Sequence, residues 1–378
     1  MATTVGILGG GQLARMMAIA GAPLGLRFKV VDTADDSCAS QVAPVLRADY
    51  TDFDALARFA QTVDVVTFDF ENVPAATAHF LAARVPVFPN PGALETAQDR
   101  LLEKQLFQKL GLGTPAFATV DSRTELAAAL VEVGAPAILK TRRLGYDGKG
   151  QFRLRSVADL DAAWTALGGV PLILESLVPF EFEVSVIGVR GRDGAFAAYP
   201  LTRNWHQNSI LSASLAPAPS PGLLDADATA FARRLAEDLN YVGVFALELF
   251  VYDGRLLANE MAPRVHNSGH WTIEGARTSQ FENHLRAVTG LPLGSTQARE
   301  TAVMLNWIDA LPDAHAVLSE PLGHWHDYGK TPRAGRKVGH ATVSGPAAAV
   351  ASTLRRIATA LGRSAQIDPV VKTISAGA

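Results

Sequence analysis

Features of secreted, membrane-spanning and nucleic-acid-binding proteins are scarce in this sequence. Cys38 is the only cysteine among 378 residues, so no disulfide can form within the chain and a reducing compartment is expected. No apolar run is long enough to span a bilayer, and no basic stretch followed by an apolar core precedes the first strand-like run. We therefore expect a cytoplasmic protein that has no membrane partner.

Charged residues are also few. They make up 19% of the chain, and the formal net charge is -3 without any long run of Lys and Arg. Non-specific binding of nucleic acid needs a basic surface that displaces counterions from phosphates, so no nucleic-acid partner is expected. A few local cations are enough to hold a small anionic substrate, and this composition leaves that class of ligand open.

The chain lacks internal repeats, and its first third alternates short apolar runs with amphipathic segments. This alternation predicts an α/β fold with a parallel sheet that helices cover on both faces. The predicted strands span residues 5–8, 28–32, 63–68 and 85–88, and the predicted helices span residues 12–20 and 54–61. Helical periodicity over residues 94–110 predicts a further helix that ends at Gly111.

Because the length exceeds what one hydrophobic core usually serves, we expect two or three domains. The predicted units are an N-terminal parallel α/β domain (1–92), a connecting helix (93–113), a small α+β lid (114–190) and a larger C-terminal α+β domain (191–378) with a closing unit from about residue 301. The lid should contain strands 137–141, 151–155 and 172–175. In the C-terminal domain, Asp253-Gly254 predicts a hairpin between strands 244–252 and 256–259.

A glycine-rich turn follows the first predicted strand. Its sequence, Gly9-Gly10-Gly11-Gln12-Leu13-Ala14, fits a G-x-G-x-x-A dinucleotide fingerprint, and Asp32 ends the second strand as that fold requires. Backbone N–H groups at the helix N-terminus could bind a nucleotide there, or the glycines could serve only close strand–helix packing. A single fingerprint is weak, so we favour a substrate contact at Gly11, Gln12 and Leu13 over NAD binding.

A second glycine-rich segment, residues 143–151, lies between two predicted strands of the lid. Its glycines let the backbone approach an anionic ligand closely, and Lys140 and Lys149 supply positive charge. The segment has no Walker A pattern. An ordinary hairpin turn would also explain it, so a phosphate-covering role depends on the other motifs.

Two glutamates stand in neighbouring predicted strands that are otherwise apolar. Glu248 lies inside residues 244–250, and Glu260 ends residues 256–260. A buried carboxylate is costly unless it is paired or binds a metal, and the hairpin would bring both glutamates, with Asn259, to one edge. Hard oxygen ligands suit Mg²⁺ that bridges ATP phosphates. Pairing with a cation such as Arg264 would explain one glutamate, whereas two favour a metal.

A polar loop follows Glu260. Arg264 could stabilise charge on a transferring phosphoryl group or hold a carboxylate. Pro263 and Gly269 interrupt any helix, so zinc binding by the two histidines of His266-Asn267-Ser268-Gly269-His270 is not expected. His266, Asn267 and Ser268 are instead candidate substrate contacts. Glu71 is another candidate, because it follows the strand over residues 63–68 at the edge where open α/β sheets bind ligands.

Taken in order, these motifs resemble the ATP-grasp superfamily, and most closely its N5-carboxyaminoimidazole ribonucleotide synthetases. The resemblance covers nearly the whole chain and is carried by residues 7–13, 99–100, 145–151, 241–244, 259–264, 265–271 and 333–340. The H-N-S-G-H-W and G-R-K-V-G-H stretches are its narrowest signals. Ala14, where Gly is common, and Met261, where Leu is common, are conservative departures.

The resemblance implies a three-domain ATP-grasp ligase that carboxylates 5-aminoimidazole ribonucleotide with ATP and bicarbonate, through carboxyphosphate, in purine biosynthesis. It implies that Glu248 and Glu260 bind two Mg²⁺ ions and that the protein is a homodimer. The implied ATP contacts are Arg100, Lys140, Gly145, Tyr146, Asp147, Gly148, Lys149, Gly150, Gln151, the adenine hinge Glu175, Ser176, Leu177 and Val178, then Glu183, His206, Asn259 and Glu260.

The same resemblance places the ribonucleotide. Its implied contacts are Gly11, Gln12, Leu13, Glu71, Tyr146, Asp147, His266, Asn267 and Ser268, with Arg336 and Lys337 on the 5′-phosphate. The resemblance changes our interpretation of the basic cluster around Arg336, which otherwise reads as a solvated turn. Arg264 and Lys149 would neutralise charge during phosphoryl transfer, and Asp147 or His266 would deprotonate the amine; the sequence does not choose between them.

Three other functions compete with this one. A formate-dependent glycinamide ribonucleotide transformylase shares the ATP-grasp motifs, but the H-N-S-G-H-W stretch argues against it. A nicotinamide-dependent oxidoreductase would rest on the glycine fingerprint and would leave Glu248 and Glu260 unexplained. A non-catalytic nucleotide-binding regulator would not need the pair of metal-binding carboxylates.

Overall fold

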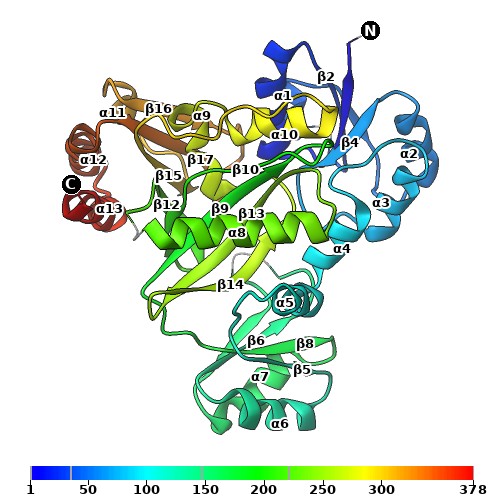
Figure 1. The fold of residues 1–378 in the computed structure, drawn as a ribbon, viewed down its shortest axis with the longest axis vertical. Coiled ribbons are helices and arrows are strands. Elements are labelled where there is room, and N and C mark those ends of the chain that lie inside the picture. Colours follow the sequence, from blue (N-terminus) through cyan, green and yellow to red (C-terminus); the bar gives the residue numbers. More distant parts are fainter. Residues whose placement is uncertain (1, 35, 146–147, 220–221, 378) are drawn as a thin grey trace.

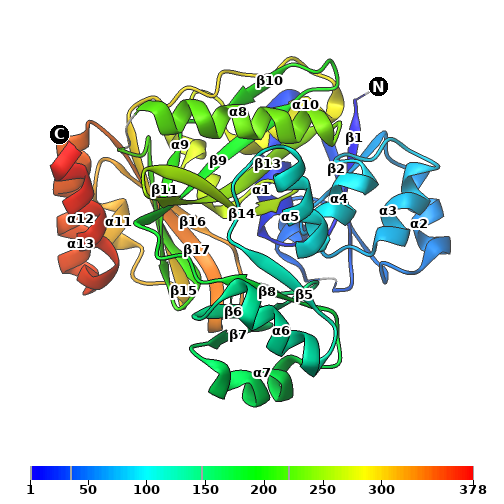
Figure 2. The ribbon, with the colours of Figure 1, turned by 60° about the horizontal axis from the view of Figure 1, so that its bottom comes forward.

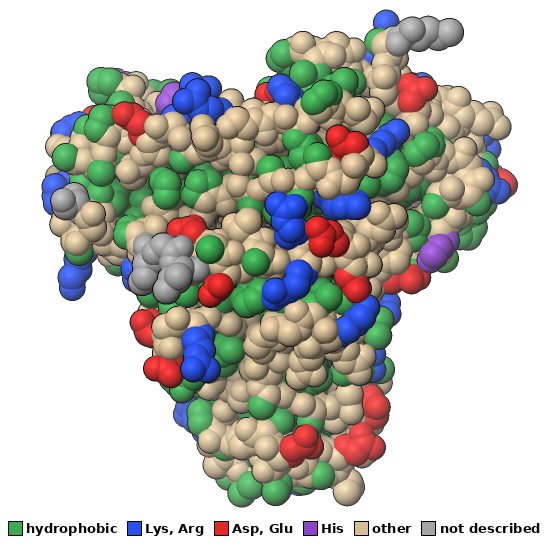
Figure 3. Space-filling view, viewed as in Figure 1, with side chains coloured by type: hydrophobic (Ala, Val, Ile, Leu, Met, Phe, Trp, Pro, Cys, Tyr) green, Lys and Arg blue, Asp and Glu red, His purple; other side chains and the backbone are tan. Residues whose placement is uncertain are grey.

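The computed structural model describes residues 2–34, 36–145, 148–219 and 222–377, whose strands form three sheets (Figure 1). The N-terminal sheet lies to one side, a central sheet spans the middle, and a small lid projects from it. On the face seen in Figure 3, side chains of Lys, Arg, Asp and Glu are scattered singly or in small mixed groups. That scatter agrees with the low share of charged residues in the sequence.

The N-terminal sheet is parallel and has the order β3-β2-β1-β4. Its strands are β1 (Thr4–Leu8), β2 (Arg27–Asp32), β3 (Val45–Arg47) and β4 (Val65–Phe68), and its helices are α1 (Gln12–Gly21), α2 (Phe53–Ala60) and α3 (Ala75–Ala82), with α10 (Gln280–Thr289) from later in the chain. Val5 and Ile7 pack in one core with α1 and α10, whereas Leu8 packs in another with α2 and α3. Helices on both faces confirm the predicted α/β arrangement.

The predicted strand over residues 85–88 is wrong. This segment contributes only a single bridge, between Val66 and Val87, beside the end of β4. Val66 N–H donates to the Pro86 carbonyl and Phe88 N–H donates to the Val66 carbonyl, both at 2.9 Å, but Pro86 itself has no N–H group with which to extend the pairing.

The single helix predicted over residues 94–110 is also wrong. Two helices, α4 (Pro91–Gln98) and α5 (Arg100–Lys109), fill this region and are separated at Asp99. The backbone of Asp99 is extended, and its side chain accepts the N–H of Leu101 at 3.0 Å as the N-cap of α5. The capping bond replaces the helical bond that a continuous helix would have made.

The lid is an antiparallel sheet in the order β5-β8-β6-β7. Its elements are β5 (Phe117–Val120), α6 (Arg123–Val133), β6 (Ala137–Thr141), β7 (Gln151–Leu154), α7 (Leu160–Leu167) and β8 (Leu172–Ser176). The three predicted lid strands are confirmed to within one residue. Apolar residues of the sheet and of both helices share a core of their own.

The central sheet has the order β14-β13-β9-β11-β12-β15-β17-β16, with β10 paired to β9. Its strands are β9 (Phe182–Arg190), β10 (Phe196–Ala198), β11 (Thr202–Gln207), β12 (Ile210–Ala216), β13 (Gly243–Tyr252), β14 (Arg255–Ala262), β15 (Thr301–Asp309), β16 (Gly323–Asp327) and β17 (Arg333–Gly345). Val184 and Val186 pack in a core with α8 (Gly222–Asp238), whereas Ile187 and Val189 pack in the core that contains α10. The period-two alternation of β9 therefore places helices on both faces (Figure 2).

The C-terminal elements continue this sheet beyond β12. Apolar residues of β12, β15 and β17 share a core with α12 (Ala347–Leu361) and α13 (Ser364–Gly377). Two short helices, α9 (Thr272–Gly275) and α11 (His315–Leu318), lie in the connections. The longest helix of the described residues, α8, has 17 residues, and none of the described helices combines the length and apolarity that a membrane crossing needs.

The predicted hairpin between β13 and β14 is confirmed. Asp253 and Gly254 have φ angles of 50° and 66°, as a two-residue turn with two left-handed residues requires. Glu260 does not end its strand as predicted, because β14 continues to Ala262. The register shifts between Glu248 and Leu249, which leaves Asn259 as an extra residue beside Glu260.

A buried histidine joins the N-terminal and central sheets. His284 of α10 is fully buried, accepts the Val244 N–H on Nδ1 at 3.0 Å, and places Nε2 at 2.7 Å from Thr67 Oγ1. Because Nδ1 accepts a hydrogen bond, the ring is neutral and Nε2 donates to Thr67. Burial lowers the pKa of His284 to about 4.

We predict that His284 makes the protein sensitive to acid. The unfolded state, with a pKa of about 6.5, binds a proton at this site before the folded state does, so stability falls as the pH drops from about 6.5 toward 4. Between pH 7 and pH 5 this site should remove roughly 2 kcal/mol from the free energy of unfolding. Urea denaturation at both pH values should show a smaller pH-dependent loss for His284→Gln than for the wild type. The exposed His79 supplies the control, and an equal loss in wild type, His284→Gln and His79→Gln would contradict the prediction.

Candidate active site

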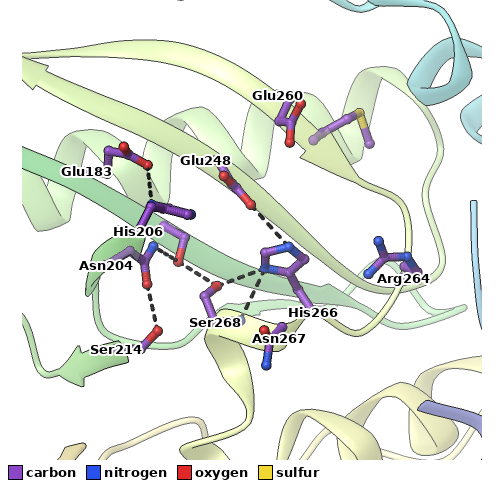
Figure 4. Close-up of polar contacts among 12 residues, drawn as sticks. Glu183, Asn204, His206, Ser214, Glu248, Glu260, Arg264, His266, Asn267 and Ser268 are labelled. Carbon is purple, nitrogen blue, oxygen red and sulfur yellow. Dashed lines mark hydrogen bonds and ion pairs between the residues drawn. The ribbon is translucent and has the colours of Figure 1, made fainter. Parts of the chain in front are cut away.

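Glu248 and Glu260 face each other across the β13–β14 hairpin. They are register partners in this antiparallel pair, so their side chains leave the same face of the sheet (Figure 4). Glu248 Oε1 lies 3.1 Å from His266 Nε2, and Glu260 Oε2 accepts a hydrogen bond from Arg100 at 2.8 Å. Neither carboxylate pairs with Arg264, but Glu260 pairs with another arginine, Arg100, so the alternative of an arginine partner holds for Glu260.

The environment keeps Glu248 ionised. Burial raises the pKa of Glu248, but the hydrogen bond and charge of His266, with the charge of His206, outweigh burial and hold that pKa below its usual range. Glu260 is more accessible, with 40% of its side chain exposed. One buried and one accessible carboxylate, with the amide oxygen of Asn259 beside them, offer hard oxygen donors on one face. This donor set fits Mg²⁺.

Glu183 and His206 lie beside Glu248. His206 Nδ1 is 2.8 Å from Glu183 Oε2, and donor atoms of all three residues lie within 4.8 Å of one another. The sequence assigned Glu183 and His206 to the nucleotide and Glu248 to the metal. The fold brings the two groups together because β9, β11 and β13 are neighbours in the central sheet.

A buried chain of hydrogen bonds supports the polar loop beneath these carboxylates. Ser214 Oγ donates to Asn204 Oδ1 at 2.8 Å, and Asn204 Nδ2 donates to Ser185 Oγ at 3.1 Å. Ser185 Oγ then donates to Ser268 Oγ at 2.7 Å, and Ser268 Oγ lies 2.9 Å from Nδ1 of His266 (Figure 4). The chain fixes the imidazole so that its other nitrogen faces Glu248. Asn267 also has a fixed orientation, because it exchanges amide hydrogen bonds with Asn306 at 2.7 and 3.1 Å.

On the lid side, Glu175 lies between two lysines. Lys140 Nζ is 2.9 Å and Lys104 Nζ is 3.3 Å from Glu175 Oε2. Burial raises the pKa of Glu175, but the two lysines outweigh it and lower that pKa to about 2. Its other oxygen, Oε1, is buried and has no hydrogen-bond partner among the described residues. Such an acceptor suits a donor on a ligand at this edge of the lid, where Ser176, Leu177 and Val178 follow half-buried.

Asp99 anchors the glycine-rich loop of the lid. Arg142 donates to both oxygens of Asp99, at 3.0 and 2.7 Å, and Arg143 donates to one of them at 3.2 Å. The loop then passes Arg100, since a Cβ added at Gly145 would lie 3.6 Å from the guanidinium of Arg100. Gly148 and Gly150 have positive φ angles, while Lys149 and Gln151 are exposed. Tyr146 and Asp147 lie outside the described residues.

The glycine-rich turn after β1 is already occupied by carboxylates of the protein. Gly10 N–H donates to Asp32 at 2.6 Å, Gly11 N–H donates to Asp69 at 2.9 Å, and Ala14 N–H donates to Asp69 at 2.6 Å. These N–H groups would have to bind the pyrophosphate of a dinucleotide, so the geometry argues against NAD at this turn. The glycines serve close packing instead, because a Cβ at Gly11 would lie 2.3 Å from Asp69 Oδ2.

Of the three substrate contacts predicted on this turn, Gln12 presents the available side chain. Leu13 is buried in the core of α1, so a contact there would be limited to its backbone. Gln12 Oε1 accepts a hydrogen bond from Lys330 at 2.5 Å. Lys330 was missed by the sequence reasoning. The feature that could have identified it is its position in the sequence, directly after Gly329 and three residues before the basic cluster.

Lys330 stands near the basic cluster at the start of β17. Burial lowers the pKa of Lys330, and the positive charges of Arg336 and Lys337 lower it further. Arg336 donates to the carbonyl of Thr331 at 3.1 Å. The cluster is the beginning of β17 rather than a turn, and Lys330, which donates to Gln12, is near enough to Arg336 and Lys337 to feel their charge.

Arg264 pairs with Glu71 on the side of the N-terminal sheet. Burial raises the pKa of Glu71, but the Arg264 guanidinium outweighs it and holds that pKa below its usual range. In return the carboxylate raises the pKa of Arg264 despite its burial. The pair joins the loop after β4 to the loop after β14, so two chain units converge at this point.

Sequence models of three protein families match successive parts of the chain. The ribonucleotide synthetase preATP-grasp domain matches residues 1–98, and the ATP-grasp domain matches residues 105–281. The phosphoribosylaminoimidazole carboxylase C-terminal domain matches residues 302–353. The three matches follow the order of the N-terminal sheet, the lid with the central strands, and the strands from β15 onward.

Similar proteins cover almost the full length of the chain. It is 53% identical over 339 residues to the N5-carboxyaminoimidazole ribonucleotide synthase of Pseudomonas aeruginosa, and the match covers 90% of this chain and 94% of that protein. The N5-carboxyaminoimidazole ribonucleotide synthetase structure from Thermus thermophilus is 52% identical, with a TM-score of 0.91 over 94% of this chain and 98% of that one. A structure from Aspergillus clavatus, of N5-carboxyaminoimidazole synthase with ADP and 5-aminoimidazole ribonucleotide, is 32% identical, with a TM-score of 0.88 over 96% and 99%.

We predict that Asn204→Leu destabilises the protein by about 1–3 kcal/mol, because the buried hydroxyls of Ser185 and Ser214 lose their partner. Urea denaturation measures this loss. Gln105→Leu on the exposed face of α5 is the control and should change the free energy of unfolding by less than about 0.5 kcal/mol. Equal stability of Asn204→Leu and Gln105→Leu would show that the chain contributes nothing.

Proposed function

The chain belongs to the N5-carboxyaminoimidazole ribonucleotide synthase family of ATP-grasp ligases, and from this we propose that it carboxylates 5-aminoimidazole ribonucleotide with ATP and bicarbonate. The observation that carries the proposal is the opposition of Glu248 and Glu260 on one face of the central sheet. Across from them, Arg100 and Lys140 supply the positive charge that ATP phosphates need.

The reaction has two parts. An oxygen of bicarbonate attacks the γ-phosphorus of ATP, the bond from that phosphorus to the β–γ bridging oxygen breaks, and ADP leaves as carboxyphosphate forms. Carboxyphosphate then divides into CO₂ and phosphate. The amine nitrogen of the ribonucleotide adds to the carbon of CO₂ and gives up a proton.

The metal residues fit the first part. Glu248 and Glu260, with Asn259, would hold Mg²⁺, which neutralises charge on the ATP phosphates when it is bound. In the protein alone, Glu260 pairs with Arg100 and Glu248 lies 3.1 Å from His266 Nε2. A bound nucleotide would bring negative charge and a bound metal would bring positive charge. A carboxylate could therefore exchange its protein partner for the metal, and a cationic side chain could exchange its partner for a phosphate.

The adenine end of the nucleotide is proposed to lie at the lid edge. Glu175 Oε1 is the buried acceptor that lacks a partner, and the hinge residues Ser176, Leu177 and Val178 follow it. Glu183 and His206 would contact the ribose from β9 and β11. The loop 145–151 would cover the phosphates, with its glycines allowing close approach and with Lys149 adding charge.

The ribonucleotide is proposed to bind between the N-terminal sheet and β17. Lys330, Arg336 and Lys337 would bind its 5′-phosphate beside Gln12. Glu71, Arg264, His266, Asn267 and Ser268 would meet the ring and ribose. Arg264 is positioned by Glu71 to face the charge that develops on carboxyphosphate, and Asp147 and His266 stay the candidate bases. A role for His266 would require it to leave Glu248.

Three further expectations remain proposals. We infer that two Mg²⁺ ions bind, since two carboxylates and an amide oxygen are available for them. A homodimer is expected from the family resemblance, and exposed Ile19, Val42 and Leu46 of the N-terminal unit are candidate contacts. A cytoplasmic location is supported by the lone Cys38, which is buried and reduced.

We predict that release of ADP requires both bicarbonate and 5-aminoimidazole ribonucleotide. Glu260→Ala should lower the rate at least about 100-fold, because a bound metal contributes several kcal/mol to phosphoryl transfer and 1.4 kcal/mol is a factor of ten. The assay follows ADP with each substrate omitted in turn. The control is Glu132→Gln, which changes an exposed carboxylate on α6.

Two outcomes would contradict this prediction, and each affects a different part of it. ADP release that needs neither bicarbonate nor the ribonucleotide would rule out the carboxylase. Full activity of Glu260→Ala, equal to that of Glu132→Gln, would rule out the metal assignment while leaving the carboxylase intact.

A further inference from the structure

Helix α5 buries two adjacent ionisable residues and exposes a leucine. Glu103 is 2% exposed and Lys104 is 0% exposed, whereas the adjacent Leu102 is 40% exposed. Leu106 and Phe107 of α5 are buried on the same side of the helix, in the core that contains α8, so packing of this side also buries Glu103 and Lys104. Because desolvation of such ionisable groups is costly, Glu103 and Lys104 need specific polar partners there.

The partners of Lys104 come from two different sheets. Its Nζ donates to the carbonyl oxygen of Asn259 on β14 at 2.9 Å, and it lies 3.3 Å from Glu175 Oε2 on β8 of the lid. Figures 1 and 2 both show α5 between β14 and the lid strands. A single ammonium group therefore joins the strand of the metal-binding carboxylate to the lid edge where the nucleotide base is proposed to lie.

Glu103 holds the same strand one residue beyond Glu260. Its Oε1 accepts the N–H of Met261 at 2.6 Å, and no apolar side chain could accept that bond. Lys104 binds the peptide oxygen that precedes Glu260, and Glu103 binds the peptide nitrogen that follows it. The two contacts therefore hold the backbone of β14, one on each side of Glu260, at the bulge in which Asn259 is the extra residue.

A bulge needs such support. It interrupts the ladder of hydrogen bonds, so the peptide groups around it lose part of the restraint that a regular strand provides. Small rotations of these peptides would swing the Glu260 carboxylate away from Glu248. Groups that orient a metal ligand from behind typically change metal affinity or activity by about 10- to 100-fold when they are removed.

We propose that Glu103 and Lys104 are positioning residues that hold the Asn259–Met261 bulge. They keep Glu260 opposite Glu248 and at a fixed distance from Glu175 of the lid. Neither residue touches the reacting atoms. The proposal rests on the proposed function, because it assigns the metal to Glu248 and Glu260 and the nucleotide to the lid edge.

The test compares two lysines of the same helix. Lys104→Met removes the buried ammonium group, and Lys109→Met removes an exposed one that pairs with Asp238 at 2.6 Å. Calorimetry measures ADP binding in EDTA, and electron paramagnetic resonance measures Mn²⁺ binding in the presence of ADP, both without turnover. We expect Lys104→Met to weaken Mn²⁺ binding about 10- to 100-fold and to weaken ADP binding as well. Lys109→Met should match the wild type.

Steady-state kinetics separate positioning from general damage. Lys104→Met should lower kcat and raise the Mg²⁺ requirement, while the KM for 5-aminoimidazole ribonucleotide stays within about threefold of the wild type. A Lys104→Met protein that binds Mn²⁺ and ADP as Lys109→Met does would overturn the proposal. An equal loss of affinity for the metal, the nucleotide and the ribonucleotide would overturn it too, because that pattern indicates damage to the whole fold.

Glu103 supplies a second pair of variants, which decides the matter if Lys104→Met does not fold. Glu103→Gln keeps an oxygen that can accept the Met261 N–H, whereas Glu103→Leu removes it. Glu103→Gln should retain at least about tenfold tighter Mn²⁺ binding than Glu103→Leu, and equal binding by the two would refute the role of Glu103. Wild-type protein that binds Mn²⁺ and ADP but forms no product would refute the proposed function alone.

Discussion

Charge that has been removed from water needs a partner, and this requirement shapes the whole region between the lid and the central sheet. Glu260, Glu175 and Glu71 are each neutralised by a cation on another element, and Glu248 Oε1 lies 3.1 Å from His266 Nε2. An unpaired buried charge would cost several kcal/mol, so the elements that carry these partners must pack in one arrangement. The ligands of an ATP-dependent ligase carry charges of both signs and can replace protein partners on either side of each pair.

The β13–β14 hairpin sets the geometry of the proposed metal donors. Its two-residue turn fixes the register, and the register makes Glu248 and Glu260 direct neighbours on one face. A shift by one residue would turn one of them to the apolar face that packs against α8. The bulge at Asn259 then places an amide beside the second carboxylate without disturbing the apolar residues Leu256, Ala258 and Met261, which remain in the core.

Local patterns predicted the elements well but did not predict their partners. Alternation and the Asp253-Gly254 turn were enough to predict β1, β2, the lid strands β6, β7 and β8, and the β13–β14 hairpin, because those signals depend on neighbouring residues alone. The central strands β9, β11 and β12 were not predicted. The break at Asp99 was missed because the periodicity of α4 and α5 continues across it, and only the capping bond reveals it. Glu103 and Lys104 read as the solvated face of a helix, since the acceptors and donors that bury them lie more than a hundred residues away on β14. Likewise, the glycine turn matched a dinucleotide motif whose N–H groups are taken by Asp32 and Asp69.

Ion pairs and hydrogen bonds of the same kind hold the lid and its glycine-rich loop beside the proposed substrate site. Lys140 and Glu175 pair within the lid sheet. Lys104 of α5 contacts both that sheet and β14, so α5 is held by contacts to both. The glycine-rich loop is anchored at its start, where Arg142 and Arg143 bind Asp99. At its other end the Thr141 N–H donates to the Gly150 carbonyl at 2.8 Å, and Gly148 and Gly150 have positive φ angles. The proposed reaction needs water to be excluded from carboxyphosphate, and this loop, held at both ends and passing beside Arg100, is the part of the lid that we propose for it.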